Sequence, residues 1–242
     1  MAISVDDSVT AFAATIAETG SIESGAFTPP DGSLLYLCLN IQESTGPNGV
    51  TVAGGGLTWT KRVARGAADG DVGAVEIWTA VVGTGASMTI TVTRDGTGDA
   101  AGRRVRAKVY ILTGQGASPI GASNKGAWTV NLTTGEITAT GAGRLLGVGT
   151  DINANGTPDN AANQTESTFH NATQMSGVSI YRDADHSSGT VGIVFDGELE
   201  TTIAGNWAVL EILAAGAGPP PPDAMYEATY PRISRRRRMV QV

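Results

Sequence analysis

Two parts of the chain repeat the same series of apolar segments in the same order. The segment Gly32–Ile41 (GSLLYLCLNI) is matched later in the chain by Gly143–Ile152 (GRLLGVGTDI). Three further segments and their matches follow in the same order: Val75–Trp78 with Val178–Tyr181, a Thr/Val-rich run with Thr190–Asp196, and Val105–Gly114 with Trp207–Gly216. An ordered repeat of short apolar segments indicates that one set of β-strands occurs twice.

Runs of alternating apolar and polar residues, bounded by Gly, Asp, Asn and Pro, recur along the chain from Leu34 to Ala214. They predict short strands, including Leu57–Val63 and Ala127–Leu132, and no segment shows the period of a long amphipathic helix. We therefore expect an all-β fold, a jelly-roll-like β-sandwich with internal duplication. Its related halves, Phe27–Gly114 and Glu136–Gly216, would either share one core or form two packed halves within a body of residues 1–218.

The composition agrees with a strand-rich fold. Only 16% of the residues are charged and 33 are glycine, against a typical charged share of about 25%. The single cysteine, Cys38, lies in the apolar run LLYLCLNI and is expected to be a core residue; without a second cysteine no disulfide forms within the chain, as is usual in a reducing cytosol. The first twenty residues lack the basic start and long apolar run of a signal peptide, and no stretch reaches the ~20 apolar residues of a membrane span.

Charge is divided unevenly between the body and a C-terminal tail. The whole chain has a net charge of −7, whereas residues 219–242 hold five arginines and only two carboxylates, which leaves a body of net −10. Four prolines, Pro219–Pro222, begin the tail and favour an extended polyproline spacer. We therefore expect the basic residues to be presented away from an acidic body.

The tail is predicted to dock on a partner protein, because apolar side chains are interleaved with its arginines. An acidic partner surface, such as another copy of the body, would suit it, and so would phosphate; a solvated tail is the alternative without a partner. Nucleic acid is the less favoured partner because the acidic body repels phosphates. The predicted docking residues are Tyr226, Tyr230, Ile233, Arg235, Arg236, Arg237 and Arg238.

Residues 151–159 resemble the first nine positions of a calcium-binding loop. Oxygen-bearing side chains alternate at Asp151, Asn153, Asn155 and Asp159, with glycine at the sixth position. The twelfth position, where such loops carry a bidentate glutamate, is Ala162. The segment is therefore a weak candidate for a calcium site, and a polar turn is the simpler interpretation. We otherwise expect no cofactor.

Other candidates offer little chemistry. Trp128, in a polar neighbourhood, could stack on a sugar ring. His186 follows Asp185, but no nucleophile or third group stands at a catalytic spacing, so we expect no enzymatic activity. Arg103, Arg104, Arg106 and Lys108 form a second basic stretch, which we interpret as a solvated strand face or a contact with an acidic neighbour rather than a nucleic-acid site.

The segments FTPPDGSLLYLCLNIQ, GLTWTKRV, AVEIWTAVV, SMTITVT and RVRAKVYILTG resemble a β-sandwich domain of bacteriophage virion proteins, often labelled minor tail proteins. The resemblance covers Ser24–Gly114 most clearly and extends in weaker form to Gly216. It implies a rigid, multi-copy module on the outside of a virion, with surface adhesion as a common task and no catalytic residues to transfer. The short Pro-then-Arg tail departs from long fibre proteins and makes a capsid decoration subunit as plausible as a tail-tip protein.

We therefore expect a phage structural protein that folds in the host cytoplasm and is located in the virion. Its partners would be other virion proteins and copies of itself, as a homo-oligomer and, by analogy with other surface appendages, a trimer. The alternative is an adhesion module that binds host-surface glycans through Trp128 and the Asp151–Asp159 loop. No membrane partner is expected.

Overall fold

The computed structural model describes residues 1–16, 20–42, 49–66, 73–94, 103–128, 133–151, 162–171, 175–195 and 205–216. Within these ranges the protein is all-β, with sixteen strands, no helix, and antiparallel pairing throughout. None of the described residues forms a helix that could cross a membrane.

The first part of the chain forms two sheets. The first inner sheet has the order β1-β9-β4-β7-β6, with β2 also paired to β9, and the first outer sheet has the order β3-β8-β5. The strands of these sheets are β1 (Ser4–Asp6), β2 (Phe12–Ile16), β3 (Ser21–Glu23), β4 (Leu34–Ile41), β5 (Val50–Gly54), β6 (Thr60–Arg65), β7 (Ala74–Val81), β8 (Ile90–Arg94) and β9 (Arg103–Thr113).

The second part forms two more sheets. The second inner sheet has the order β10-β16-β12-β14-β13, and the second outer sheet pairs β11 with β15. Their strands are β10 (Gln115–Trp128), β11 (Thr133–Ala139), β12 (Gly143–Asp151), β13 (Gln164–Asn171), β14 (Met175–Arg182), β15 (Gly189–Phe195) and β16 (Gly205–Ala214).

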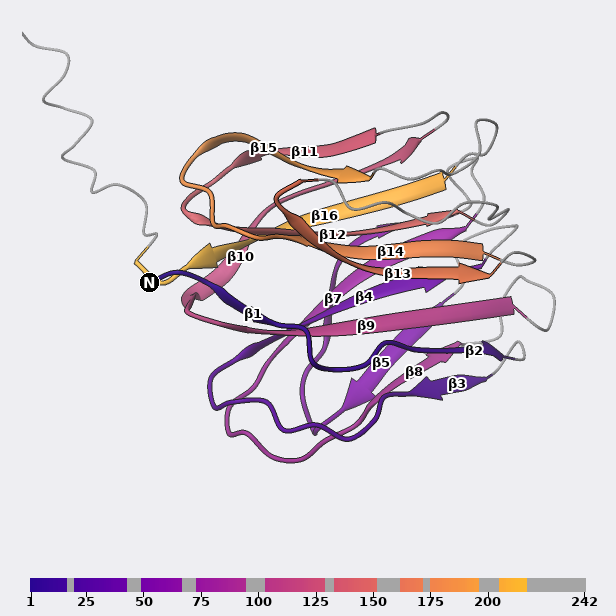
Figure 1. Cartoon of the computed structure of the whole chain (residues 1–242). Coiled ribbons are helices and arrows are strands. Elements are labelled where there is room, and N and C mark those ends of the chain that lie inside the picture. The colour runs from indigo at the N-terminus through magenta and orange to yellow at the C-terminus, as the bar shows by residue number, and fades with distance from the viewer. Residues whose placement is uncertain are drawn as a thin grey trace, which may run out of the picture.

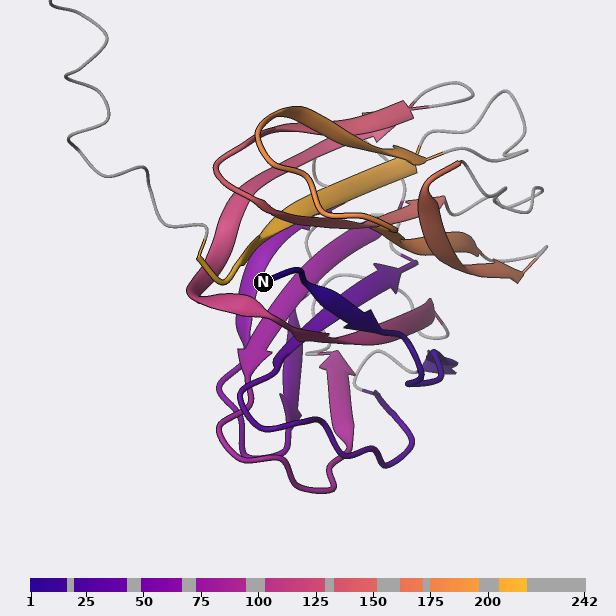
Figure 2. The same ribbon diagram turned by 60° about the vertical axis from the view of Figure 1, so that its left-hand side comes forward.

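The four sheets lie in layers, with the two inner sheets face to face in the middle (Figure 1). Figure 2 shows the same order from another side, with β11 and β15 at the top and the first outer sheet at the bottom. Each gap between layers is filled by its own cluster of buried apolar side chains. The described chain therefore has two packed halves, each with a core of its own, and a third, central core between them.

Strand β4 shows how the sequence supports this layering. Every residue of LLYLCLNI is buried because both faces of the strand are covered. Leu35, Leu37 and Leu39 pack toward the first outer sheet, whereas Tyr36 and Cys38 pack into the central core. Two covered faces make a strand read as a continuous apolar run rather than as an alternating one. The expectation that Cys38 is a core residue is confirmed, and burial raises the pKa of its thiol to about 12.

The two inner sheets share one strand order, as the repeated sequence predicts at the level of whole strands. Strands β9, β4, β7 and β6 follow one another across the first inner sheet just as β16, β12, β14 and β13 do across the second. In the outer layers, β3 pairs with β8 as β11 pairs with β15. Beside β9 the first half has β1 and β2, where the second half has the long strand β10.

At the level of single residues the sequence match pairs side chains that lie on opposite faces of the two inner sheets. It aligns Leu34 with Leu145, but Leu34 lies in the central core and Leu145 lies in the core beneath the second outer sheet. The aligned pair Val75 and Val178 is divided between the same two cores. A shift of one residue reverses the face of every side chain in a strand, so the strands correspond although these residues do not.

Two strand predictions need correction. β6 begins at Thr60 rather than Leu57, after the turn that contains Gly54–Gly56. β10 begins at Gln115, far before the predicted start at Ala127, and its pairing with β16 shifts register twice. The segment lacks a clear alternating pattern and contains Pro119, so only its pairing along the length of β16 identifies it as a strand.

The halves contact each other in a reciprocal way. β4 lies against β12 at the centre, β7 contacts β16, and β9, the counterpart of β16, contacts β14, the counterpart of β7. These contacts are those of an isologous, two-fold interface only in part, because β6 also contacts β16 whereas no contact of similar extent joins their counterparts β13 and β9 in the described residues.

Polar side chains of the first half cross this interface to backbone carbonyls of the second. Tyr36 Oη donates to Leu146 O (3.1 Å), Asn40 Nδ2 to Gly149 O (2.6 Å) and Tyr110 Oη to Ser179 O (2.9 Å). All three donors are buried. Because a buried donor without an acceptor is costly, these bonds fix how the inner sheets are placed against each other.

Gly177 provides a test of this close packing. A Cβ atom at Gly177 would lie 2.7 Å from Cγ of Asn40, whose amide is already held by Gly149. We expect Gly177→Ala to lower the free energy of unfolding by about 1–3 kcal/mol, measured by urea denaturation, because the Asn40 amide must move. Gly83→Ala is the control, since its Cβ would meet nothing within 4 Å. Equal stability of the two variants would contradict a tight interface at Asn40.

Candidate functional site

The described residues place Met1 beside the end of β16 at one end of the molecule, here called the attachment end. The Met1 ammonium donates to Ala215 O (2.9 Å), one residue after β16 ends, and Ala215 N donates to Gly114 O (2.8 Å). Figure 1 shows the N-terminus beside the end of β16. Ala215, next to the last described residue, therefore lies beside Met1.

All of the predicted docking residues of the tail lie outside the described residues. This applies to Tyr226, Tyr230, Ile233 and Arg235–Arg238 alike. Their docking role stays a prediction.

Two other candidates come together at the opposite end, here called the display end. Trp128 is the last residue of β10 and Asp151 the last of β12, and both pair in register with Gly205 at the start of β16. Their backbones are thus two strand spacings apart, about 9–10 Å. The sequence separates these residues widely, and the pairing with β16 brings them to one edge of the second inner sheet.

The rest of the calcium-loop candidate lies outside the described residues. Asn153, Asn155 and Asp159 are among these, and so are the side chains of Asp151 and Trp128. Within the described ranges no group of three or more His, Cys, Asp or Glu residues could hold a metal ion.

The interpretation of the second basic stretch as a solvated strand face is wrong for Arg106 and Lys108. Arg106 is 2% exposed; it donates to Asn40 in the neighbouring strand β4 and, across the interface, to Ser179 and Ser167. Lys108 is 5% exposed, and its Nζ donates to the carbonyl oxygens of Asp7 and Val9. Both residues face the second half or the N-terminal segment instead of water, so they belong to the packing of the body.

Burial also explains the electrostatics of this pair. Loss of hydration lowers the pKa of the Lys108 ammonium, and the nearby Asp7 opposes that shift. Burial likewise lowers the pKa of the Arg106 guanidinium. Sequence alternation placed the two side chains on one face correctly, but it could not show that a second sheet covers that face.

His186 and Glu211 form a buried pair near the attachment end. His186 Nε2 lies 2.8 Å from Glu211 Oε1, and since a carboxylate only accepts, the ring proton sits on Nε2. Glu211 also accepts from Thr140, from the backbone N–H of Ala122 and from Gly141. One carboxylate thus ties together β10, β16, the β11–β12 turn and the β14–β15 connection.

Burial by itself would raise the pKa of Glu211, but the hydrogen bonds from Thr140, His186 and the backbone lower it overall. The carboxylate is therefore charged in the folded protein at neutral pH. In the sequence, the carboxylate next to His186 is that of Asp185. In the structure Asp185 instead forms an ion pair with Arg144, whose Nε lies 2.7 Å from Asp185 Oδ1. The actual partner of His186, Glu211, comes from a distant strand.

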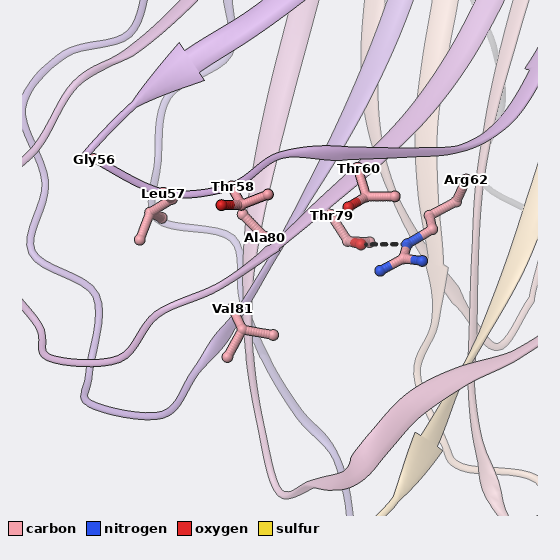
Figure 3. Close-up of a pocket in the computed structure, with 8 residues that line it drawn as sticks. All are labelled: Gly56, Leu57, Thr58, Thr60, Arg62, Thr79, Ala80 and Val81. Atoms are coloured by element: carbon pink, nitrogen blue, oxygen red, sulfur yellow. Dashed lines mark hydrogen bonds between the residues drawn. The ribbon is translucent and has the colours of Figure 1, made fainter.

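Two open grooves flank the interface at the attachment end. The first has a volume of about 420 Å³ and lies where the turn before β6 meets β7 (Figure 3). Arg62 Nε donates to Thr79 Oγ1 (2.8 Å) beside Thr60, and Val81, which is 60% exposed, lies further along the groove. The second groove, about 400 Å³, lies between β1 and the β13–β14 pair, and its lining includes Val5, Tyr181 and Asp183. No sequence pattern indicated either groove.

Removal of the Glu211 charge tests its role as a clamp. Glu211→Gln keeps the size of the side chain but turns an amide N–H₂ toward existing donors, and we expect it to lower the free energy of unfolding by about 2–4 kcal/mol at pH 7. Glu136→Gln, a change at an exposed glutamate, is the matched control and should alter stability by less than about 0.5 kcal/mol.

The pH dependence of stability provides a second test of the Glu211 carboxylate. Because the pKa of Glu211 is lowered in the folded state, its contribution to stability is complete above its unfolded pKa of about 4.3 and is lost as the pH falls through the lower folded value. Denaturation between neutral pH and pH 3 should show a smaller loss of stability for Glu211→Gln than for wild type. Parallel pH profiles would contradict the clamp.

The comparisons with known proteins give no relative for this chain. No family model, no curated protein and no solved structure matches it.

Proposed function

We propose that this chain is a bacteriophage structural protein, a multi-copy subunit of the virion surface such as a minor tail or capsid decoration protein. The observation that carries the proposal is the polarity of the body: Met1 and Ala215, close to the end of the described chain, lie at the attachment end, and Trp128 and Asp151 lie at the display end. A body of this kind can be held by its terminal segments while its opposite end faces outward. The role is one of assembly and involves no catalysis.

The proposal includes a finer description of the fold. Each half is a β-sandwich, jelly-roll-like, and the two arose by duplication of one strand set. Support comes from the shared strand order of the inner sheets and from the matching pairs in the outer sheets. Two sandwiches joined through a third core form a rigid body. Rigidity suits a subunit whose role is structural rather than catalytic.

The tail serves as the anchor in this proposal. Tyr226, Tyr230 and Ile233 would bury apolar surface, while Arg235–Arg238 would pair with carboxylates of an acidic neighbour, since the body carries a net charge of −10. Asp183, in the groove beside the N-terminus, provides one such carboxylate at the end of the body where Met1 and Ala215 lie. The neighbour would be another copy of this chain or a second virion protein.

Truncation after Gly218 tests the anchor. The shortened chain keeps every described residue, so we expect its thermal unfolding to match that of the full chain. Light scattering at low salt should give an oligomer for the full chain and a monomer for the truncated chain, and high salt should dissociate the oligomer. A full-length variant with Arg235–Arg238 changed to serine is the control for charge at constant length. Equal molar masses for all three chains would contradict self-docking and direct the search to another virion protein.

A second candidate, a host-glycan adhesion module, is favoured by one observation. Pairing with β16 brings the backbones of Trp128 and Asp151 to the same edge at the display end. An aromatic ring beside acidic and amide groups is a common arrangement for sugar binding, because the ring stacks on the sugar and the polar groups bind its hydroxyls.

A glycan array tests this candidate. If the chain is an adhesion module, it should retain at least one glycan class, and Trp128→Ala should reduce binding by about tenfold or more, the equivalent of ~1.4 kcal/mol. Trp78→Phe, at a half-buried position in the first half, is the matched control and should leave binding unchanged. No retained glycan, with or without calcium, would remove the adhesion role and leave the structural one untouched.

A further inference from the structure

Arg94 is a buried cation in an apolar setting. It is the last residue of β8, and it has the same strand parity as Ile90 and Val92, which are fully buried in the core of the first half. Arg94 itself is 2% exposed. Its side chain therefore enters the gap between the first outer and first inner sheets.

Two of the three nitrogens of the Arg94 guanidinium lack acceptors in the described part of the chain. Its Nε and Nη1 atoms are buried and have no hydrogen-bond partner there. Arg106, which is equally buried, instead has acceptors on three residues, and Arg144 is held by Asp185, Arg182 and Ile3. The contrast shows that this protein usually provides partners for a buried arginine.

The position of Arg94 in β8 indicates from which end of the molecule an acceptor would reach its side chain. β8 starts at Ile90, which pairs with Gly54 beside the Gly54–Gly56 turn, and it ends at Arg94, which pairs with Val50. Its course thus runs from the attachment end to the display end, where β4 and β12 also end. The charged head lies at the mouth of the first half rather than in the middle of its core.

A buried charge without a partner is costly, and a guanidinium fits the two oxygens of a carboxylate or phosphate. We propose that Arg94 forms the base of an anion-binding site at the display end, which takes a carboxylate or phosphate group. Low polarity around the site strengthens the ion pair once the anion has entered. This inference does not depend on the proposed virion role, since it rests on the burial and the unpaired nitrogens of Arg94.

The test measures the thermal unfolding temperature, Tm, of the full chain in phosphate, acetate and chloride at equal ionic strength. We expect phosphate or acetate to raise Tm by about 4–8 °C over chloride at roughly thirty times the Kd. Arg94→Leu should abolish this increase. In chloride its Tm should equal or exceed that of wild type, because an apolar side chain replaces an uncompensated charge.

Arg62→Leu is the matched control, because it removes the same charge from an exposed arginine, and it should keep the wild-type response to anions. Titration calorimetry of wild type with phosphate, compared with Arg94→Lys, gives a second measurement if the leucine variant does not fold. The lysine variant should bind at least tenfold more weakly, since it lacks the two-pronged donor.

Two results would overturn the proposal. One is an equal response to phosphate and acetate in wild type and in a folded Arg94 variant, including no response in either. The other is a lower Tm of Arg94→Leu in chloride, which would show that a carboxylate of the chain itself already holds the guanidinium and is left unpaired by the change. Neither result would bear on the tail anchor, which is tested by molar mass.

Discussion

The structure depends on the face-to-face packing of the two inner sheets. β4 and β12 lie at the centre of that contact, and the apolar side chains of the central core are supplied by both halves. A purely apolar contact between two sheets would allow sliding along the strands. The hydrogen bonds from Tyr36, Asn40 and Tyr110 to carbonyl oxygens of the second half remove that freedom, because each buried donor has one satisfactory position.

The same contact explains several residues that look unusual in sequence. Arg106 and Lys108 read as a surface stretch, yet the second half and the N-terminal segment cover them and supply their acceptors. Cys38 lies fully buried between the two inner sheets, and this burial raises the pKa of its thiol to about 12. Glu211 serves the second half in a similar way, since one charged group satisfies donors from three separate segments. The buried polar residues of this body therefore serve mainly to hold the strands and sheets in place rather than to carry out a reaction.

The reciprocal contacts between the halves have a functional consequence. The two ends of the molecule differ in content although the strand order repeats: Met1 and Ala215 are at one end, and Arg94, Trp128 and Asp151 are at the other. The body thus has two different ends. That property suits a subunit of a surface assembly, and it separates the part that would attach from the part that would meet a ligand.

The sequence by itself determined the all-β class, the order of the repeated strands and the core position of Cys38, because alternation and turn residues act over a few neighbouring positions. It did not determine strand β10, the phase of the repeat at Leu34 and Leu145, or the burial of Arg106, Lys108 and Arg94. Nor did it identify Glu211 as the partner of His186. Each of these depends on which sheet covers a given face. Only the tertiary structure decides that, since the residues that meet across the layers are far apart in the chain.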